Sequence, residues 1–283
     1  MAKSFDTIGI LHRSDRKEAR EYSLKVAQWL AKKGKTVRSV LSPIPKVSEA
    51  KSLDELDLMV VLGGDGTYLQ AVGLLDGRDV PVLGANFGHT GFLTEAKAEE
   101  ILTVLEDVLK GKGRAQERSM LDVTIKGKGK KARTFRALND VVVERGGDTH
   151  LIEMSVVQGG RLVTRFRADG LIIATPTGST AYNLSAAGPI VHPGVPAIVV
   201  TPVCPHSLTA RSITVPDSED IQIKLNNPNR SAVIMVDGQS GGELGSDEEM
   251  VIKKSKCRHI MLSSQNYDYF ERLNAKLQFG QRT

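Results

Sequence analysis

The chain is poor in cysteine. Its 283 residues include only two, Cys204 and Cys257. Two thiols cannot form a disulfide framework, and they cannot supply the four ligands of an all-cysteine zinc site. We therefore expect both to be free thiols buried in the core.

Long apolar runs are also missing. No run approaches the roughly 20 residues that span a bilayer. The first residues, Met1 to Phe5, contain no apolar core typical of a signal peptide. We expect a cytoplasmic protein with no membrane attachment.

Aromatic residues make up only 5% of the chain and do not alternate with basic residues. This composition argues against a stacking platform for single-stranded nucleic acid, so we expect no nucleic-acid partner. The net charge is +5, a mild excess that suits anionic ligands such as nucleotides but decides little by itself.

Several common motifs are incomplete. Gly34–Thr36 resembles the end of a P-loop, but Trp29 occupies the position of the first glycine. Gly238–Gly242 fits G-x-S-x-G, yet a glycine-rich acidic stretch follows in place of a helix. Leu69 replaces the last glycine of a G-x-G-x-x-G pattern, and the six histidines lack metal-ligand spacing.

The first part of the chain alternates strand and helix patterns. This rhythm predicts an α/β domain with a Rossmann-like parallel sheet, doubly wound by helices. The expected strands are 5–12, 36–41, 57–62 and 81–85, and the expected helices are 15–33, 67–75 and 97–110. Ser14 is a candidate N-cap of the first helix, and Gly34 and Gly111 are candidate helix ends.

From about Arg114 the pattern changes to short strands separated by turns, which predicts an all-β sandwich. Lys126–Lys131 is a candidate hairpin turn or, less simply, a polyphosphate contact. We expect domains over 1–115 and 116–264, with a C-terminal helix in 265–283 packing on the first. The expected strands include 137–144, 151–158, 162–168, 171–175, 197–203 and 231–236, with a helix over 180–187.

A glycine turn follows the third strand, in the sequence GGDGT. Gly63, Gly64 and Gly66 would permit positive φ and close backbone approach. Together with Thr67 and the N-terminus of the next helix they predict an anion site. Asp65 beside bound phosphates would accept a hydrogen bond from a substrate hydroxyl, hold Mg²⁺, or do both. Alternatively, it caps the helix.

A second polar segment is Asp169–Ile190. It places Thr177 and Gly178 at a helix start, which would receive phosphate, and Tyr182 and Asn183 where they suit a base or ribose. The simpler interpretation is a helix-capping loop. Two further motifs, Asn86–Leu93 and Leu138–Asp140, accompany expected strands.

These motifs occur in the order typical of bacterial NAD kinases, and the chain resembles that family over nearly its whole length. They are GGDGT, GHTGFL, LND, DGLIIATPTGSTAYNLSAAGPI, PVCPHSL and VDGQ. GGDG alone is shared with diacylglycerol and sphingosine kinases and, more loosely, with phosphofructokinases. The ordered set is specific. A lipid kinase would also favour a basic amphipathic helix, which this sequence lacks.

The resemblance implies transfer of phosphate from ATP, or from polyphosphate, to the 2′-hydroxyl of the adenosine ribose of NAD, giving NADP. It also implies a divalent cation, usually Mg²⁺, and Asp65 as proton acceptor. The implied phosphate contacts are Gly63, Gly64, Gly66, Thr67, Thr177 and Gly178. The implied NAD contacts are Asp65, Gly66, Asn139, Asp140, His150, Arg167, Asp169, Thr180, Ala181, Tyr182, Asn183, Leu184, Ser185 and Gln239.

The family forms homodimers or homotetramers in which a neighbouring subunit can contribute to the NAD site. This chain departs from the family pattern at three positions. Asp140 replaces a glutamate, Ala187 replaces the second glycine of SAGGP, and Ser212 replaces a proline. A nucleotide-binding regulator without catalysis would retain the glycine turns but would not need Asp65.

Overall fold

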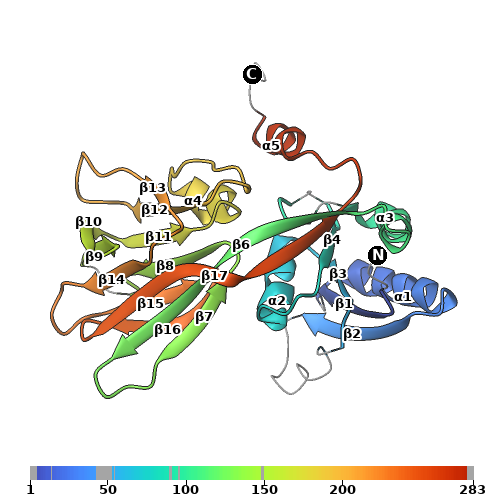
Figure 1. Ribbon diagram of the computed structural model, residues 1–283, viewed down its shortest axis with the longest axis horizontal. Helices are drawn as coiled ribbons and strands as arrows, with labels where there is room; N and C mark the ends of the chain where they lie inside the picture. The colour runs from blue at the N-terminus through green and yellow to red at the C-terminus, as the bar shows by residue number, and fades with distance from the viewer. Residues whose placement is uncertain are drawn as a thin grey trace. The chain divides into compact units, whose positions relative to one another are not determined.

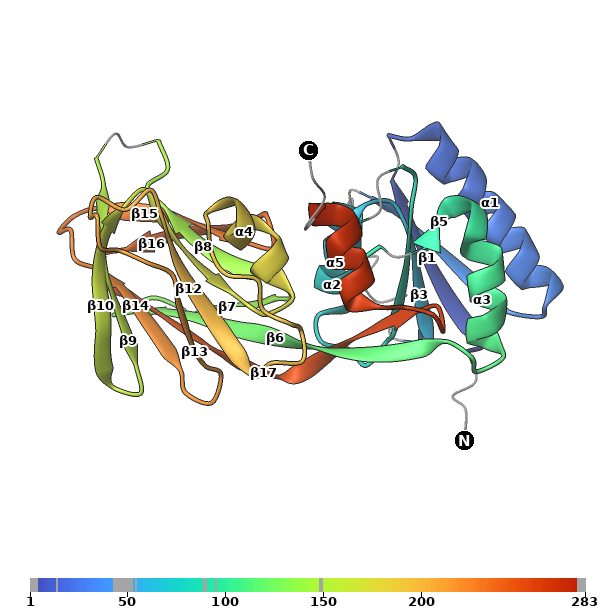
Figure 2. The same cartoon turned by 90° about the horizontal axis from the view of Figure 1, so that it is seen from above.

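The computed structural model describes residues 5–13, 15–42, 53, 55–88, 91–94, 96–147 and 150–278 (Figures 1 and 2). The candidate cap Ser14 and the loop residues His89 and Thr90 lie outside these ranges. The chain divides into two compact units. The first comprises Met1–Glu117 and Ile260–Thr283, and the second comprises Arg118–His259.

The first unit contains a parallel sheet in the order β2-β1-β3-β4. β5 and the last residues of β17 both pair with β4, and both are parallel to it. The buried strands are apolar because helices cover both faces of the sheet. The bounds are β1 Thr7–Arg13, β2 Thr36–Ser42, β3 Leu58–Leu62, β4 Val82–Asn86, β5 Ala96–Lys97 and β17 Glu248–Ser263.

Helices α1 and α3 pack on one face of this sheet, and α2 and α5 lie on the other (Figure 2). The bounds are α1 Lys17–Lys32, α2 Asp65–Leu75, α3 Ile101–Leu109 and α5 Tyr269–Leu277. Gly34 and Gly111 follow α1 and α3 with φ of +75° and +76°, which confirms them as helix ends. The expected helix over 97–110 begins instead as a 3₁₀ turn, Ala98–Glu100, because Lys97 belongs to β5.

The second unit is a sandwich of two antiparallel sheets, as expected. One sheet runs β10-β9-β14-β17, with β6 between β17 and β7, and the other runs β13-β12-β11-β8-β15-β16. The bounds are β6 Arg114–Gly127, β7 Arg133–Ala137, β8 Asp140–Glu144, β9 Ile152–Gln158, β10 Arg161–Ala168, β11 Gly170–Ala174, β12 Ala197–Val203, β13 Ile213–Pro216, β14 Ile221–Leu225, β15 Ser231–Val236 and β16 Gln239–Gly245.

The main core of this unit lies between its two sheets. Side chains from both inner faces interdigitate there, among them Val123, Val143 and Ile223. A smaller apolar cluster, including Ile172 and Val199, lies under the segment that follows β11. That segment forms only a 3₁₀ turn, Gly178–Thr180, and one helical turn, α4 Tyr182–Ser185. The expected helix over 180–187 is therefore shorter than predicted.

Three other expectations can be compared with the structure. Lys126–Lys131 connects β6 and β7, so the hairpin turn is confirmed. Both cysteines are free, but Cys204 is exposed and Cys257 is partly exposed, so their predicted burial is wrong. Within the ranges that the structure describes, no helix is long and apolar enough to cross a membrane.

Candidate functional site

The glycine turn lies at a topological switch point of the first unit. β1 and β3 are neighbours, with His12 paired to Leu62, and the chain continues from them toward opposite edges of the sheet. In open parallel sheets, ligands bind outside the carboxyl ends of the strands at such a point. Gly63–Gly66 directly follows the carboxyl end of β3.

The three glycines permit positive φ, but the folded chain does not use it. None of Gly63, Gly64 or Gly66 is among the residues with positive φ. Gly63 is required by packing, since a Cβ there would overlap the side chain of Thr67. A Cβ on Gly64 or Gly66 would meet no atom within 4 Å. The folded chain itself therefore does not require glycine at these two positions, which leaves room for a ligand at the N-terminus of α2.

Asp65 is the first residue of α2, and it does not cap that helix. Its Oδ2 accepts a hydrogen bond from the Phe92 N–H at 2.8 Å. Its Oδ1 accepts bonds from the N–H groups of Leu93 and Thr94 and from Thr94 Oγ1, each at 3.1 Å. The carboxylate thus binds three successive N–H groups of the Gly91–Thr94 turn. A Cβ on Gly91 would overlap Asp65 Oδ1, which explains the glycine there.

Asp237 does the same in the second unit. Its carboxylate accepts bonds from the N–H groups of Leu138 (2.7 Å), Asn139 (2.8 Å) and Asp140 (3.1 Å). These bonds explain why the strand expected over 137–144 begins only at Asp140. β7 ends at Ala137 and β8 begins at Asp140, because the intervening N–H groups bind a side chain. Asp237 belongs to the VDGQ motif, and its role in this turn was not predicted from the sequence.

The side chains that follow this break are buried and polar. Asn139 and Asp140 are 8% and 5% exposed, and Asn139 Oδ1 has no hydrogen-bond partner. Burial, together with repulsion from the nearby Asp237 carboxylate, raises the pKa of Asp140 to about 7. Burial also raises the pKa of Asp237, while its three backbone N–H bonds act in the opposite direction. Both carboxyl groups therefore bind a proton more readily than an exposed aspartate does.

The turn after β11 packs against this strand break. Thr175 Oγ1 donates to the Leu138 carbonyl at 2.6 Å and accepts from the Gly178 N–H at 3.0 Å. A Cβ on Gly178 would overlap the Asn139 carbonyl, so the close approach requires glycine. Thr177 Oγ1 is buried without a partner. The structure thus joins Asn139, Thr177 and Gly178 in one place, with unsatisfied oxygens that a polar ligand would satisfy.

Asn183 differs from its neighbours in the TAYN segment. It is fully buried, and its Nδ2 donates to the carbonyls of Ser179 (2.9 Å) and Pro189 (3.0 Å). Its Oδ1 accepts a bond from Thr201 Oγ1 at 2.6 Å. Every polar atom of this side chain is used inside the fold. Because the side chain is fully buried, its structural role is to hold the segment in place.

The other predicted contacts in this segment are more accessible. Tyr182 is exposed, and its hydroxyl donates to Glu144 Oε1 at 3.1 Å. Ser185 is exposed, and Thr180, Ala181 and Leu184 are partly exposed. The Thr180 hydroxyl donates to the Thr177 carbonyl at 3.3 Å. These side chains lie beside the Thr177–Gly178 turn in the sequence.

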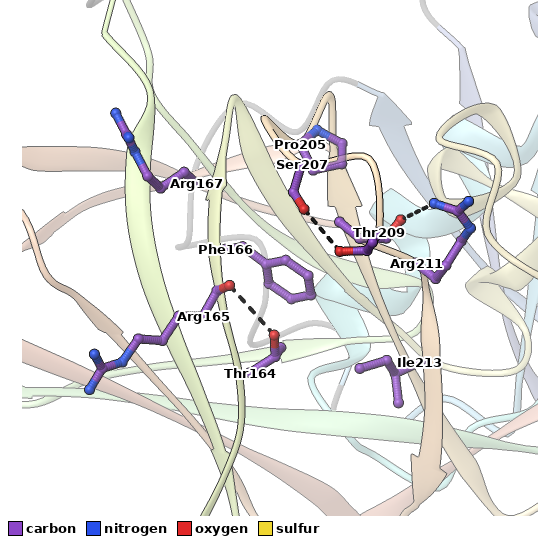
Figure 3. Close-up of a pocket in the computed structure, with 10 residues that line it drawn as sticks. Thr164, Arg165, Phe166, Arg167, Pro205, Ser207, Thr209, Arg211 and Ile213 are labelled. Atoms are coloured by element: carbon purple, nitrogen blue, oxygen red, sulfur yellow. Dashed lines mark hydrogen bonds between the residues drawn. The ribbon is translucent and has the colours of Figure 1, made fainter.

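Arg167 and Asp169 lie at the carboxyl end of β10. Asp169 Oδ1 accepts from Arg145 Nε at 2.9 Å. Arg167 contributes to the wall of a cavity of about 260 Å³, but Figure 3 shows its side chain directed away from the cavity, which Phe166 enters from the opposite face of the strand. Ser207 and Thr209 face Phe166 across it. His150 and Gln239 are exposed.

The expected divalent cation can be compared with the His, Cys, Asp and Glu side chains that the structure describes. Among the residues placed by the structure, no three His, Cys, Asp or Glu side chains cluster closely enough to hold an ion. Mg²⁺ is commonly held by one or two carboxylates together with substrate phosphates.

Comparison with protein families identifies both units. Residues 44–113 match the model for the ATP-NAD kinase N-terminal domain, and residues 138–262 match the model for its C-terminal domain. An NAD kinase of Bdellovibrio bacteriovorus is 42% identical, covering 99% of this chain and 94% of that protein. An NAD kinase of Geobacter metallireducens is also 42% identical and covers 81% of each chain.

Solved structures agree with the family match. The yeast NADH kinase complexed with NADH has a TM-score of 0.90 and 27% identity, covering 99% of this chain and 89% of that one. An NAD kinase from Archaeoglobus fulgidus in complex with ATP has a TM-score of 0.76 and 25% identity, covering 96% and 98%.

Proposed function

The chain belongs to the NAD kinase family, and on this premise we propose how its residues phosphorylate NAD with ATP. The product is NADP, formed by phosphoryl transfer to the 2′-hydroxyl of the adenosine ribose. The observation that carries the proposal is the position of Asp65. It lies at the helix start that follows a switch-point strand, between two glycines with open space beside them.

The phosphates of ATP bind at Gly64 and Gly66. Their N–H groups lie at the positive end of α2, and a substituent at either glycine would occupy the space of the ligand. Gly63 and Thr67 support this turn by packing on each other. Their contribution to phosphate binding is therefore to set the path of the backbone.

Asp65 accepts the hydrogen bond of the ribose hydroxyl through Oδ2. This oxygen accepts one bond, from Phe92, whereas Oδ1 accepts three. A carboxylate oxygen has two lone pairs, so Oδ2 has capacity for one hydroxyl donor. Because the transition state of phosphoryl transfer is loose, orienting the hydroxyl is a sufficient role.

NAD is recognised by Asn139, Asp140 and Thr177. Among the described residues, neither Asn139 Oδ1 nor Thr177 Oγ1 has a hydrogen-bond partner. The Asp237 carboxylate holds Asp140 next to Asn139 by accepting a bond from the Asp140 N–H. Tyr182 presents an exposed ring for the base or ribose. The remaining contacts implied by the family, including His150, Arg167, Asp169 and Gln239, stay predictions.

We further propose that Mg²⁺ enters with ATP and that the donor is ATP, with polyphosphate as a second candidate. In proteins, Mg²⁺ is usually bound through one or two carboxylates together with substrate phosphates, which is the basis of this proposal. A panel of ATP, other nucleoside triphosphates and polyphosphate, each with and without EDTA, measures both preferences. A cytoplasmic location also stays a prediction.

The central experiment incubates purified protein with NAD, ATP and Mg²⁺ and measures NADP with a coupled dehydrogenase. We expect Asp65→Asn to lose about 10²–10⁴-fold in kcat while NAD binding survives, because the acceptor on Oδ2 is lost. Calorimetry on the same variant measures NAD affinity. If the parent protein made no more NADP than Asp65→Asn but bound NAD equally well, the chain would be a nucleotide-binding regulator without kinase activity.

A further inference from the structure

The C-terminal helix α5 contacts the same turn that Asp65 binds. Arg272 Nη1 donates to the Gly91 carbonyl at 2.7 Å and to the Thr94 carbonyl at 3.3 Å. Lys276, one helical turn later, places its Nζ 4.7 Å from the centre of the Phe92 ring. Asp65 therefore binds the N–H groups of the Gly91–Thr94 turn, while Arg272 binds the carbonyls at its two ends.

The start of α5 is itself fixed to the first unit. Asp268 caps the helix by accepting from the N–H groups of Phe270 and Glu271 at 2.7 and 2.9 Å. Tyr267, buried just before the cap, has its carbonyl bound by Arg114 Nη1 at 3.0 Å. Leu273 adds a buried apolar contact. Arg272 thus projects from an anchored helix.

Asn86 adds support at the other end of the turn. Asn86 Nδ2 donates to the carbonyls of Thr94 and Ala96, each at 3.2 Å. The Gly91 carbonyl accepts its bond from Arg272 at a distance typical of a strong charge-assisted bond. Without Arg272, the Gly91 end of the turn would lose this bond, and the N–H groups facing Asp65 would be free to shift.

We propose that Arg272 is a positioning residue for phosphoryl transfer, holding the Gly91–Thr94 turn where it fixes the Asp65 carboxylate. The inference rests on the proposed function, because it assigns the turn a purpose in that reaction. A displacement of about 1 Å at a reacting group can cost 10²-fold in rate. Arg272 acts on the reaction indirectly, by holding the turn that binds Asp65. Its loss therefore lowers kcat more than it raises KM.

The experiment compares Arg272→Ala, Arg272→Lys and a matched control, Arg78→Ala. Arg78 also donates from Nη1 to two carbonyls, those of Leu74 and Leu75 at 3.2 Å each, at the far end of α2. We expect Arg272→Ala to lower kcat about 10- to 100-fold with KM for NAD and ATP within about threefold. Lysine retains a charged donor and restores part of the rate, and Arg78→Ala retains kcat.

Amide hydrogen exchange of Phe92, Leu93 and Thr94 provides a readout independent of activity. We expect faster exchange at these amides in Arg272→Ala, with thermal unfolding recorded to show that the variant is folded, and no change there in Arg78→Ala. Unchanged exchange, or a folded Arg272→Ala with kcat within twofold of the parent, would overturn the inference. A parent protein that made no NADP would refute the proposed kinase instead, and the exchange result would still decide whether Arg272 holds the turn.

Discussion

Asp65 and Asp237 play the same structural part in the two units. Each carboxylate accepts hydrogen bonds from the N–H groups of three successive residues, 92–94 and 138–140. Charge-assisted bonds of this kind are stronger than neutral ones, so each aspartate fixes a local backbone path. At the residue scale, the acidic groups of the site therefore shape the loops that carry the ligand contacts.

The GGDG motif left two interpretations of Asp65, a helix cap and a reactive group. Neither describes its hydrogen bonds fully, because the carboxylate binds a turn that is distant in sequence. A substitution at Asp65 accordingly does two things. It removes the acceptor for the substrate hydroxyl and loosens the Gly91–Thr94 turn. Both changes lower kcat.

Asp140 makes the stability of the protein depend on pH. Its folded pKa of about 7 lies above the ordinary value of 3.8, so the folded state retains this proton over a range in which the unfolded chain has lost it. The stabilisation is complete below about pH 4 and is lost as the pH rises to 7. Asp140→Asn removes this titration and the buried charge.

We therefore expect Asp140→Asn to gain stability relative to the parent between pH 5 and pH 8, by about 2 kcal/mol. Denaturant unfolding at the two pH values measures the gain. Asp220→Asn, at an exposed carboxylate, is the control. Equal pH dependence of parent and Asp140→Asn would show that Asp140 is ionised at pH 5 in the folded state.

At the scale of elements, the end of α4 contains a residue in an unfavourable conformation. Ala187 has φ of +60°, a region that costs non-glycine residues roughly 1–2 kcal/mol. Its N–H donates to the Leu184 carbonyl at 3.0 Å, which ends the helical turn. The family pattern has glycine at this position. In this chain the alanine adopts the positive φ at an energetic cost.

Ala187→Gly should stabilise the protein by about 1 kcal/mol, which corresponds to a rise of roughly 2–4 °C in Tm. The control is Ala186→Gly, one residue earlier, where the structure has no positive φ and glycine should destabilise. Calorimetry of both variants measures the contrast. A lower Tm for Ala187→Gly would contradict the assignment of strain to this position.

At the scale of the whole molecule, we predict that the chain forms a homodimer or homotetramer and that Leu208 lies in its interface. Leu208, in the loop between β12 and β13, is 95% exposed, more than any other large hydrophobic side chain among the described residues. Burying a leucine contributes about 1.5–3 kcal/mol, so such residues are favoured where a second copy covers them.

Light scattering after size exclusion should give the mass of a dimer or tetramer for the parent. We expect Leu208→Asp to weaken association at least about tenfold, since each copy would lose an apolar contact. Leu24→Asp, on α1 of the first unit, provides the control at another exposed leucine. A monomeric parent would contradict the proposal directly.

The sequence by itself determined the class of each unit and the family. The spacing of apolar residues and the positions of turn residues predicted the α/β and β-rich regions, because these patterns depend on neighbours close in the chain. The ordered motifs predicted the kinase family, which the matches over both units confirm. The role of Gly34 and Gly111 as helix ends was also predictable, since helix ends depend on local backbone conformation.

Only the tertiary structure decided what the polar residues bind. Asp65 and the turn that it holds are 27 to 29 residues apart, and Asp237 is 97 to 99 residues from its partners. Local pattern carries no information about contacts of this range. For the same reason the sequence could not reveal that Asn183 is satisfied inside the fold, or that Arg272 reaches the turn beside Asp65.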